Sequence, residues 1–311
     1  MLAPRPAALI VNPSAGGGRA ARVLPAVERA LAELGVASHT ELTHDLDHAA
    51  GLARAAARAG ELAVALGGDG LAGAVASALC GSDGVLGVLP GGRGNDFGRV
   101  LGLPADPVAA CEALAHGTPR PLDLGAVNGR PFIGIASCGF DSDANRHANL
   151  APARLGNFVY TYGALRALAA WRPARFELEL DGRPESYVGY TVAAANSRAY
   201  GGGMYLAPDA ELDDGMFDVV VCEFLSRTRA LAALPRVFSG SHVDHPGVHV
   251  HRVRELVIRA DRQFDVYADG DPIGVLPATI RSLPGAVRVM APSPDGPLAT
   301  GRPARRPWRR A

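Results

Sequence analysis

The sequence predicts an α/β protein in two parts, an N-terminal parallel sheet flanked by helices and a C-terminal antiparallel β-sandwich. Two observations predict the first part. Over about the first 120 residues, short apolar runs alternate with helical patterns, and three of these runs end in glycine-rich loops. A third observation predicts the second part, because beyond Pro121 apolar and polar residues alternate in the manner of half-buried strands.

Two strand–helix units open the chain. Residues 7–11 (AALIV) form an uninterrupted apolar run typical of a buried strand. A glycine-rich loop at residues 12–18 follows, and the apolar positions of residues 19–34 then fall on one face of a helix. The second unit has a short strand at residues 38–42 and a helix at residues 48–59. Such repeated units favour a parallel sheet with helices on both faces.

The third unit carries the most informative stretch of the chain, the loop at residues 67–70 (GGDG). This loop follows an apolar run that begins at Leu62, and it precedes a helical pattern over residues 71–80. A strand, a glycine loop and a helix in this order bring free backbone N–H groups to a phosphate. Asp69 adds a charge that can hold Mg²⁺ or orient a hydroxyl, so the loop indicates a nucleotide site with chemistry.

The fourth unit repeats this arrangement, with a strand at residues 85–89, a glycine loop at residues 90–94 and a helix at residues 96–101. Asn95 or Asp96 could instead serve only as the N-cap of this helix, without any role in binding phosphate. The carboxyl ends of parallel strands lie at one edge of a sheet, and ligands bind there. Two glycine loops on neighbouring strands therefore predict a shared phosphate site.

Several nucleotide-binding classes are disfavoured by particular residues. Residues 68–73 match the GxGxxG pattern, but the dehydrogenases that use it need a carboxylate about 20 positions later, and residues 88–93 contain none. The chain has no lysine, which excludes a P-loop NTPase and a protein kinase. In a kinase of this composition, backbone amides, arginine and Mg²⁺ must neutralise the phosphates.

Composition predicts a cytoplasmic protein. The formal net charge is zero, which gives no general attraction to nucleic acid, so no such partner is expected. The four cysteines form no CxxC pair, as is typical of reduced thiols. The N-terminus lacks the apolar segment of a signal peptide, and no apolar run is long enough to span a bilayer. A lipid substrate would therefore require peripheral contact with the membrane surface.

Beyond Pro121 the sequence predicts antiparallel strands. Strands are predicted at residues 176–180, 187–195, 216–224, 255–260, 264–268 and 286–290. An apolar stripe over residues 155–169 predicts a helix packed on the sandwich, with a lid or a membrane-contacting helix as the alternative. The chain is thus divided into a nucleotide-binding domain at residues 1–122, a β-sandwich domain at residues 123–291 and a disordered basic tail at residues 292–311.

The second half also contains acidic and histidine-rich candidate sites. Residues 209–215 (DAELDDG) place four carboxylates in a predicted turn, which is either solvated or a site for a hard cation. Residues 269–271 (DGD) are, taken alone, an ordinary hairpin turn. The four histidines between residues 242 and 251 fit no standard zinc spacing, and Pro246 and Gly247 favour a loop there.

Taken together, these segments resemble the diacylglycerol kinase catalytic-domain family, which includes bacterial lipid kinases and sphingosine kinases. They occur in the family's order over nearly the whole chain, and the ordered set is specific although each segment alone is weak. The matching segments are residues 11–16 (VNPSAG), 67–70 (GGDG), 94–99 (GNDFGR), 123–125 (DLG), 208–215 (PDAELDDG) and 269–271 (DGD).

The resemblance implies a Rossmann-like nucleotide-binding domain and a β-sandwich of the NAD kinase/diacylglycerol kinase type, with the active site between them. It implies transfer of the γ-phosphoryl group of ATP to a hydroxyl of diacylglycerol or a similar lipid, with Mg²⁺ as cofactor. The family's ATP-contacting positions match Asn12, Pro13, Ser14, Ala15, Gly16, Thr43, Gly67, Gly68, Asp69, Gly70, Leu71, Ala72 and Gly73, and the second glycine loop adds Arg93 and Asn95.

The resemblance also implies roles for acidic residues. Asp271 matches the proton acceptor, and Asp69 is the reserve candidate for the base or for holding catalytic Mg²⁺. Asp214 matches a structural Mg²⁺ ligand, with Glu211 and Met216 at positions where backbone carbonyls coordinate the ion.

Three residues depart from the family's pattern. Leu71 replaces the threonine usual in bacterial members, as in sphingosine kinases, and Arg93 replaces a common threonine and adds positive charge for phosphate. Asp271 stands where bacterial members usually have glutamate, which shortens the side chain by one methylene. Asp123 and Arg99 match positions of a polar network that ties the two domains together.

The resulting hypothesis is a lipid kinase. ATP binds along the glycine loops, Mg²⁺ bridges its phosphates, and Asp271 accepts a proton from the lipid hydroxyl as that hydroxyl attacks the γ-phosphorus in line. Two alternatives stay open: a kinase with a soluble acceptor, akin to NAD kinase, and a catalytically inactive nucleotide or lipid sensor. The sequence leaves the identity of the lipid and the oligomeric state open, and a homodimer is one expectation.

Overall fold

The structure is a computed structural model of the 311-residue chain. It describes residues 5–151, 162–163, 165–167, 171–224 and 226–293, so most of the helix predicted at residues 155–169 and nearly all of the tail predicted at residues 292–311 lie outside the described residues. The chain divides into two compact units. Unit 1 comprises residues 1–121 and 288–311, and unit 2 comprises residues 122–287.

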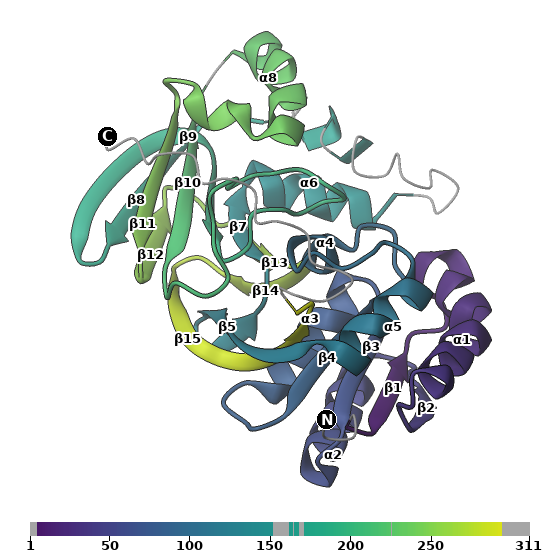
Figure 1. Ribbon diagram of the computed structural model, residues 1–311. Coiled ribbons are helices and arrows are strands. Elements are labelled where there is room, and N and C mark those ends of the chain that lie inside the picture. The colour runs from purple at the N-terminus through teal and green to yellow at the C-terminus, as the bar shows by residue number, and fades with distance from the viewer. Residues whose placement is uncertain (1–4, 152–161, 164, 168–170, 225, 294–311) are drawn as a thin grey trace. The chain divides into compact units, whose positions relative to one another are not determined.

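Unit 1 is built on a parallel sheet with the strand order β2-β1-β3-β4-β15. Its elements are β1 (Ala7–Val11), α1 (Ala15–Glu33), β2 (Ser38–Leu42), α2 (Leu46–Ala59), β3 (Leu62–Gly67), α3 (Asp69–Leu79), β4 (Val85–Pro90), α4 (Asp96–Val100), α5 (Pro107–His116) and the end of β15 (Ala278–Ala291) (Figure 1). The predicted α/β half is confirmed.

The apolar runs of β1 and β3 are buried on both faces, as a parallel sheet between two helix layers requires. Leu9, Val64 and Leu66 pack with Val27 of α1 and Leu114 of α5 in one core cluster. Helices α2 and α3 contact each other and both contact β3, while α2 also contacts β1 and α3 also contacts β4. The alternation along each strand therefore divides its side chains between two helix layers.

Helix starts and stops in unit 1 follow local chemistry. Asp45 caps α2 by accepting the N–H of His48 at 2.7 Å, and Gly60 ends that helix in a left-handed conformation. Helix α1 formally begins at Ala15, but residues 16–18 have φ of 60°, 68° and 82°, which are not helical values. The regular helix therefore begins near Arg19, the start that the sequence predicts.

The strand order creates a switch point between β1 and β3. The chain passes from β1 outward to β2, and then returns across β1 to β3, so the loops that leave β1 and β3 run to opposite faces of the sheet. Residues 12–18 follow β1, residues 67–70 follow β3, and residues 90–94 follow β4 on the same edge. Topology thus gathers the three glycine loops at the position where open α/β sheets bind ligands.

Unit 2 consists mainly of antiparallel strands, in the order β14-β13-β7-β9-β8-β12-β15, with β10 on β9 and β11 on β10. Its elements are the end of β5 (Thr118–Val127), β6 (Arg130–Phe132), β7 (Ile135–Gly139), α6 (Phe140–Asn149), β8 (Ala174–Leu180), β9 (Arg183–Ala195), β10 (Phe217–Glu223), α8 (Arg227–Ser239), the 3₁₀ turn η2 (Ser241–Asp244), β11 (Val248–Val253), β12 (Glu255–Ala260), β13 (Asp265–Ala268), β14 (Asp271–Val275) and the start of β15. The predicted antiparallel half is confirmed.

Two details of unit 2 differ from the sequence interpretation. His249 and His251 lie on β11, paired with Val221 and Val219 of β10, so only the turn around Pro246 is a loop. The last strand is longer than predicted, because β15 continues from unit 2 into unit 1, where Arg288 and Val289 pair with β4. Long-range pairing, which local alternation does not report, decides both features.

A mostly buried carboxyl at the start of α6 gives a testable pH dependence. Burial raises the pKa of Asp141 to about 6, and Tyr200 donates a weak hydrogen bond to it at 3.4 Å. The ionised carboxylate therefore destabilises the fold above that pKa, and the cost disappears below the unfolded value near 4. Asp141→Asn is expected to raise the free energy of unfolding by about 2 kcal/mol at pH 8. Urea unfolding at pH 8 and pH 4 checks this, and an equal effect at both values would contradict it.

Candidate active site

The three glycine loops of unit 1 pack backbone against backbone. The N–H groups of Gly91 and Gly92 donate to the carbonyl oxygen of Gly67 at 2.8 and 3.0 Å. A Cβ on Gly92 would lie 2.4 Å from the Cα of Gly68, and a Cβ on Gly16 would lie 2.6 Å from the carbonyl oxygen of Gly91. Glycine is needed at these positions because no side chain fits between the loops.

The first loop is held by local hydrogen bonds. Oδ1 of Asn12 accepts the N–H of Ser14 at 3.1 Å and its hydroxyl at 2.8 Å. The three glycines at residues 16–18 then take left-handed conformations in succession, which only glycine adopts readily. A Cβ on Gly17 would meet nothing within 4 Å, so this loop has an open side beside its packed side.

The second loop leads directly into α3. The N–H groups of residues 69–71 form the first turn of α3 and therefore have no acceptor within the helix. They lie at the carboxyl edge of the sheet, where a helix N-terminus can bind an anion. Leu71 and Ala72 are each 3% exposed and face the interior. Residues 71–73 therefore offer a nucleotide their backbone rather than their side chains.

Asp69 joins the second loop to the third. Its Oδ1 accepts the N–H of Phe97 at 2.9 Å, at the start of α4. Burial raises the pKa of the Asp69 carboxyl, and the hydrogen bond from Phe97 partly offsets that rise. Asp69 thus braces two loops against each other, in addition to bringing a carboxylate to the site.

The third loop is closed by Asn95, which has a left-handed φ of 53°. Its side chain accepts the N–H of Gly92 at 2.8 Å and donates to the carbonyl of Gly92 at 3.0 Å. Arg99 pairs with Asp96 and donates to the carbonyl of Gly94 at 2.9 Å. Arg93 is exposed on the loop itself, where its guanidinium is available to an anion.

Thr43 differs from the other predicted nucleotide contacts. It is 6% exposed, and its hydroxyl donates to the carbonyl of Asp45 at 2.5 Å. Its N–H donates to the carbonyl of Val11 at 2.8 Å, beside the first glycine loop. The structure therefore places Thr43 next to that loop with its hydroxyl engaged at the start of α2.

In unit 2, the segment at residues 269–271 forms a two-residue hairpin turn between β13 and β14. Asp269 and Gly270 have φ of 55° and 94°, as a type I′ turn requires. The Asp269 carboxylate accepts the N–H groups of Ile133 and Gly134 at 2.8 Å each, which fixes the hairpin. Asp271 is exposed as the first residue of β14, yet partial burial of its carboxyl raises its pKa.

The acidic turn of unit 2 is organised by Asp123, which is 3% exposed. Its carboxylate accepts the N–H of Gly215 at 2.6 Å and that of Gly285 at 2.7 Å, and its own N–H donates to the carbonyl of Leu212 at 2.7 Å. The buried carboxylate thus holds the turn that contains the predicted metal-binding residues.

Asp214 lies in an electrostatic cluster that sequence reasoning found only in part. Its carboxylate accepts the N–H of Met216 at 2.9 Å and pairs with Arg252. Nε of Arg252 also lies 3.4 Å from Oδ1 of Asp218 in β10, and burial raises the pKa of Asp218 to about 6. Asp218 was missed, although a carboxylate inside the apolar run FDVVV signals a buried partner.

The residues around Asp214 fit a hard cation by charge. One guanidinium faces two carboxylates, and Asp209 and Glu211 add further negative charge that opposes ionisation of Asp218. In the described part of the chain no three acidic, histidine or cysteine side chains converge on a metal position. A cation here would therefore depend on Asp214 together with backbone carbonyls and water.

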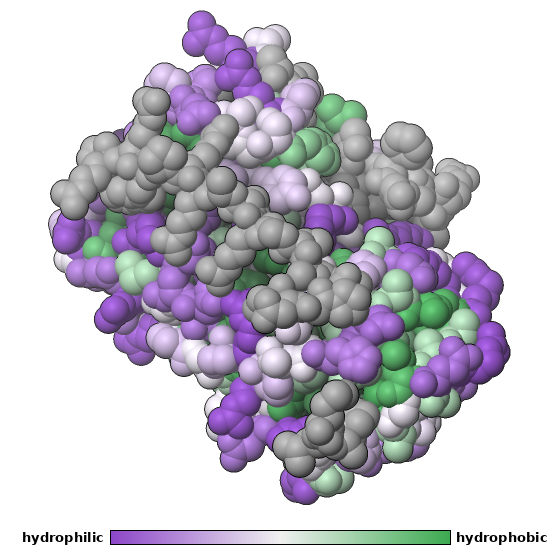
Figure 2. Space-filling model, viewed as in Figure 1, coloured by the Kyte–Doolittle hydropathy of each residue, from purple (hydrophilic) through white to green (hydrophobic). Residues whose placement is uncertain are grey.

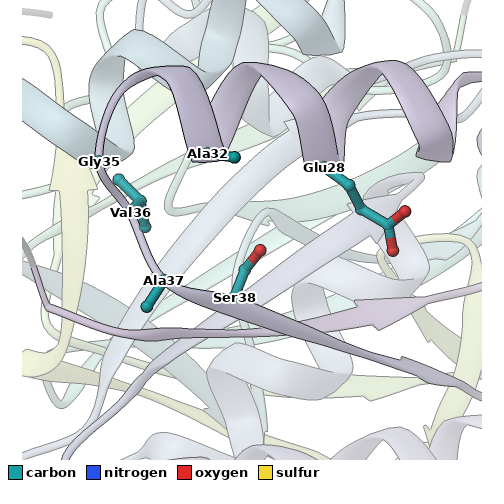
Figure 3. Close-up of a pocket in the computed structure, with 6 residues that line it drawn as sticks. All are labelled: Glu28, Ala32, Gly35, Val36, Ala37 and Ser38. Atoms are coloured by element: carbon teal, nitrogen blue, oxygen red, sulfur yellow. The ribbon is translucent and has the colours of Figure 1, made fainter.

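A cavity of about 490 Å³ lies elsewhere in unit 1. It is lined by Glu28 and Ala32 of α1 and by residues 35–38 before and at the start of β2 (Figure 3). These residues lie at the amino end of β2, on the edge of the sheet opposite the glycine loops. Because it lies at the other edge of the sheet, this cavity adds nothing to the phosphate site, and Oε1 of Glu28 in its lining accepts the Thr40 hydroxyl at 2.6 Å.

The predicted site residues thus form two groups. Unit 1 brings together the three glycine loops with Asp69, Arg93 and Asn95, and unit 2 holds Asp271 on a hairpin and Asp214 in the acidic turn. Residues 6–127 match the family model of the diacylglycerol kinase catalytic domain, and residues 134–291 match the model of the YegS C-terminal NAD kinase beta sandwich-like domain. The chain belongs to the diacylglycerol kinase family.

Curated relatives cover most of this lipid kinase. A diacylglycerol kinase of Mycobacterium tuberculosis is 35% identical over 294 residues, covering 91% of this chain and 94% of the relative. A diacylglycerol kinase of Bacillus subtilis is 30% identical over 295 residues, covering 92% and 96%. A probable lipid kinase YegS-like of Pseudomonas aeruginosa is 34% identical over 234 residues, covering 74% and 76%.

Solved structures agree on the fold of the kinase. A putative diacylglycerol kinase from Bacillus anthracis superposes with a TM-score of 0.77 at 22% identity, covering 94% of this chain and 98% of that one. A second diacylglycerol kinase structure from the same organism gives a TM-score of 0.73 at 19% identity. These similarities support the two-part α/β and β-sandwich architecture.

Proposed function

We propose that this kinase transfers the γ-phosphoryl group of ATP to a hydroxyl of diacylglycerol or a closely similar lipid. The observation that carries the proposal is the convergence of three glycine loops at the switch point of a parallel sheet, in a chain of the diacylglycerol kinase family. Unit 1 binds ATP, and unit 2 supplies the proton acceptor and the acceptor lipid's surroundings. Most of the rate acceleration comes from positioning the lipid hydroxyl against the γ-phosphorus and from neutralising the charge of the phosphates.

In this proposal the phosphates rest on backbone N–H groups. The first turn of α3 provides donors, the open side of the first loop leaves room for the phosphates, and the exposed Arg93 adds a positive charge. Because the chain has no lysine, no ammonium group shares this task. Mg²⁺ on the nucleotide would supply the remaining neutralisation of phosphate charge.

Asp271 is the proposed proton acceptor, with Asp69 in reserve. Partial burial raises the pKa of Asp271, which strengthens it as a base when it is ionised. Asp69 already accepts a hydrogen bond from Phe97, and this contact favours a bracing role over proton transfer. A structural Mg²⁺ would be held by Asp214 with the backbone carbonyls of Glu211 and Met216.

The acceptor is proposed to be met at a membrane surface. Within the described residues, no helix is both long enough and apolar enough to cross a membrane. A diacylglycerol-like substrate resides in the bilayer, so the enzyme must make peripheral contact with that surface. A homodimer remains a proposal for the oligomeric state.

The decisive experiment measures transfer from radiolabelled ATP, with Mg²⁺, to a panel of acyl glycerols, sphingoid bases and soluble acceptors including NAD. Label in the organic-extractable diacylglycerol product is the expected result. Label confined to a water-soluble product would favour the NAD kinase-like alternative. ATP binding without transfer to any acceptor would favour an inactive sensor.

A further inference from the structure

One helical segment of unit 2 has an unusual distribution of charge. Acidic residues make up 31 of the 311 residues, but residues 224–243 contain none of them and carry three arginines. The formal charge of the whole chain is zero, so the positive charge of this segment is a local property. A stretch of basic and apolar residues without carboxylates is typical of segments that meet anionic lipid.

Helix α8 gives this segment a defined shape. Its thirteen residues span about 20 Å at 1.5 Å per residue. Arg229 and Arg236 are exposed and, being seven residues apart, lie on the same side of the helix. No residue of α8 itself is acidic, and both arginines are exposed to solvent.

Exposed aromatic side chains lie just before α8 and in its last turn. Phe224, three residues before the helix, is 45% exposed, and Phe238 in its last turn is 56% exposed. Phe224 is held in place because its N–H donates to the carbonyl of Val188 at 3.0 Å and its ring stacks on Tyr190 at 5.5 Å. Val188 is itself 41% exposed, which extends the apolar surface beside Phe224.

The C-terminal end of α8 is anchored to the rest of unit 2. Tyr205 donates its N–H to the carbonyl of Val237 at 2.9 Å, and a Cβ on Gly240 would lie 2.9 Å from the Cβ of Pro208. Helix α8 lies at the edge of the unit 2 strands (Figure 1), and the surface over it is mainly hydrophilic with hydrophobic residues at its margin (Figure 2). The helix is thus a fixed, exposed element.

We infer that α8, together with Phe224 before it, forms the surface that docks on anionic lipid, with Arg229 and Arg236 at the headgroups and Phe224 and Phe238 at the acyl boundary. The inference rests on the proposed lipid kinase function, which requires contact with a bilayer. Charge complementarity selects this occupant, because the two exposed arginines of α8, a helix that contains no carboxylate, match an anionic surface. Aromatic rings beside basic residues are suited to the membrane interface.

The test measures binding of the full chain to phosphatidylcholine vesicles with or without phosphatidylglycerol, by co-sedimentation in the absence of ATP. The unmodified protein is expected to prefer the anionic vesicles, and added salt is expected to weaken binding. The double variant Arg229→Glu, Arg236→Glu is expected to bind anionic vesicles at least about tenfold more weakly. Phe238→Ser is expected to weaken binding a few-fold on both vesicle types.

The matched control is Arg54→Glu, Arg58→Glu, which makes the same charge change on exposed positions of α2 in unit 1. This control is expected to bind almost as well as the unmodified protein. Equal losses in the two double variants would overturn the inference, because net charge rather than α8 would then govern binding. A change in oligomeric state caused by the α8 variants would also overturn it, in favour of a contact between copies of the chain.

A second assay separates this inference from the proposed function. Phosphorylation of a short-chain diacylglycerol in detergent solution needs no vesicle, so the α8 double variant should retain the unmodified rate there. Undiminished vesicle binding by that variant, together with normal phosphorylation in detergent, would contradict the α8 surface alone. Weakened vesicle binding together with no phosphorylation of any lipid by the unmodified chain would contradict the kinase function and leave the α8 surface supported.

Discussion

Asp271→Asn is expected to lower kcat for lipid phosphorylation by about 10²–10⁴-fold, because a general base in the transition state contributes roughly that factor. The substitution keeps the size of the side chain and removes its ability to accept a proton. Asp271 is exposed at the start of β14, so the fold should be unaffected. Steady-state kinetics with a short-chain diacylglycerol in detergent measures the effect, and thermal unfolding verifies the fold.

The pH profile gives a second measurement on the same residue. Only the ionised carboxylate accepts a proton, and partial burial raises the pKa of Asp271 above its ordinary value. In the unmodified enzyme, kcat/KM is therefore expected to rise with pH through that raised pKa and to level off above it. The Asp271→Asn variant should lose this acidic limb.

Two variants serve as controls for Asp271. Asp265→Asn makes the same chemical change on the neighbouring strand of the hairpin, where the side chain is exposed, and should keep near-normal kcat. Asp271→Glu restores the residue that the resemblance gives as usual in bacterial members, and should retain substantial activity. Full activity of Asp271→Asn would remove Asp271 from the base role and direct attention to Asp69.

Gly92→Ala is expected to reduce kcat/KM by about 10²-fold or more and to weaken ATP binding. The new Cβ would lie 2.4 Å from the Cα of Gly68, so two backbone segments must separate by about 1 Å, and displacements of this size cost roughly that much rate. The N–H of Gly92 also bonds to the carbonyl of Gly67 and to Asn95, so the third loop would shift as a whole. Kinetics and nucleotide titration measure the effect.

Two other glycines provide controls for this clash. A Cβ on Gly17 would meet nothing within 4 Å, so Gly17→Ala tests left-handed strain in the first loop without a steric conflict and should cost only about 1 kcal/mol of stability. Gly51 lies in α2 with equally open surroundings, and Gly51→Ala should be neutral or slightly stabilising. If Gly92→Ala retained the activity of these controls, close loop packing would not be needed for catalysis.

Local sequence predicted the elements of unit 1 well because their boundaries depend on local physics. The strand at Ala7–Val11 was predicted with its observed bounds because an unbroken apolar run can be buried on both faces. Gly60 and Asp45 mark the ends of α2 through their own backbone and side-chain preferences. In unit 2, the hairpin turn at Asp269-Gly270 is predictable for the same reason, because both residues tolerate a positive φ.

The candidate site was predictable where the chemistry lies in a continuous segment, and not where it depends on partners distant in sequence. The glycine loops could be read from the sequence, whereas the pairing of Asp218 with Arg252 could not, since 34 positions separate them and only the β10–β11 register makes them neighbours. The anchoring of Asp269 on Ile133 and Gly134 likewise depends on a contact across unit 2.

Periodicity and glycine placement along the chain are enough to predict strand–helix units followed by antiparallel strands, with three glycine loops at the ends of strands. Only the folded chain shows that Gly16 lies against Gly91 and Gly92 against Gly68 through bare backbone, and that Asp123 holds the acidic turn. The two differ because the periodicity of a sequence reports which face of a helix or strand is buried, whereas strand order and register determine which residues pack against that face.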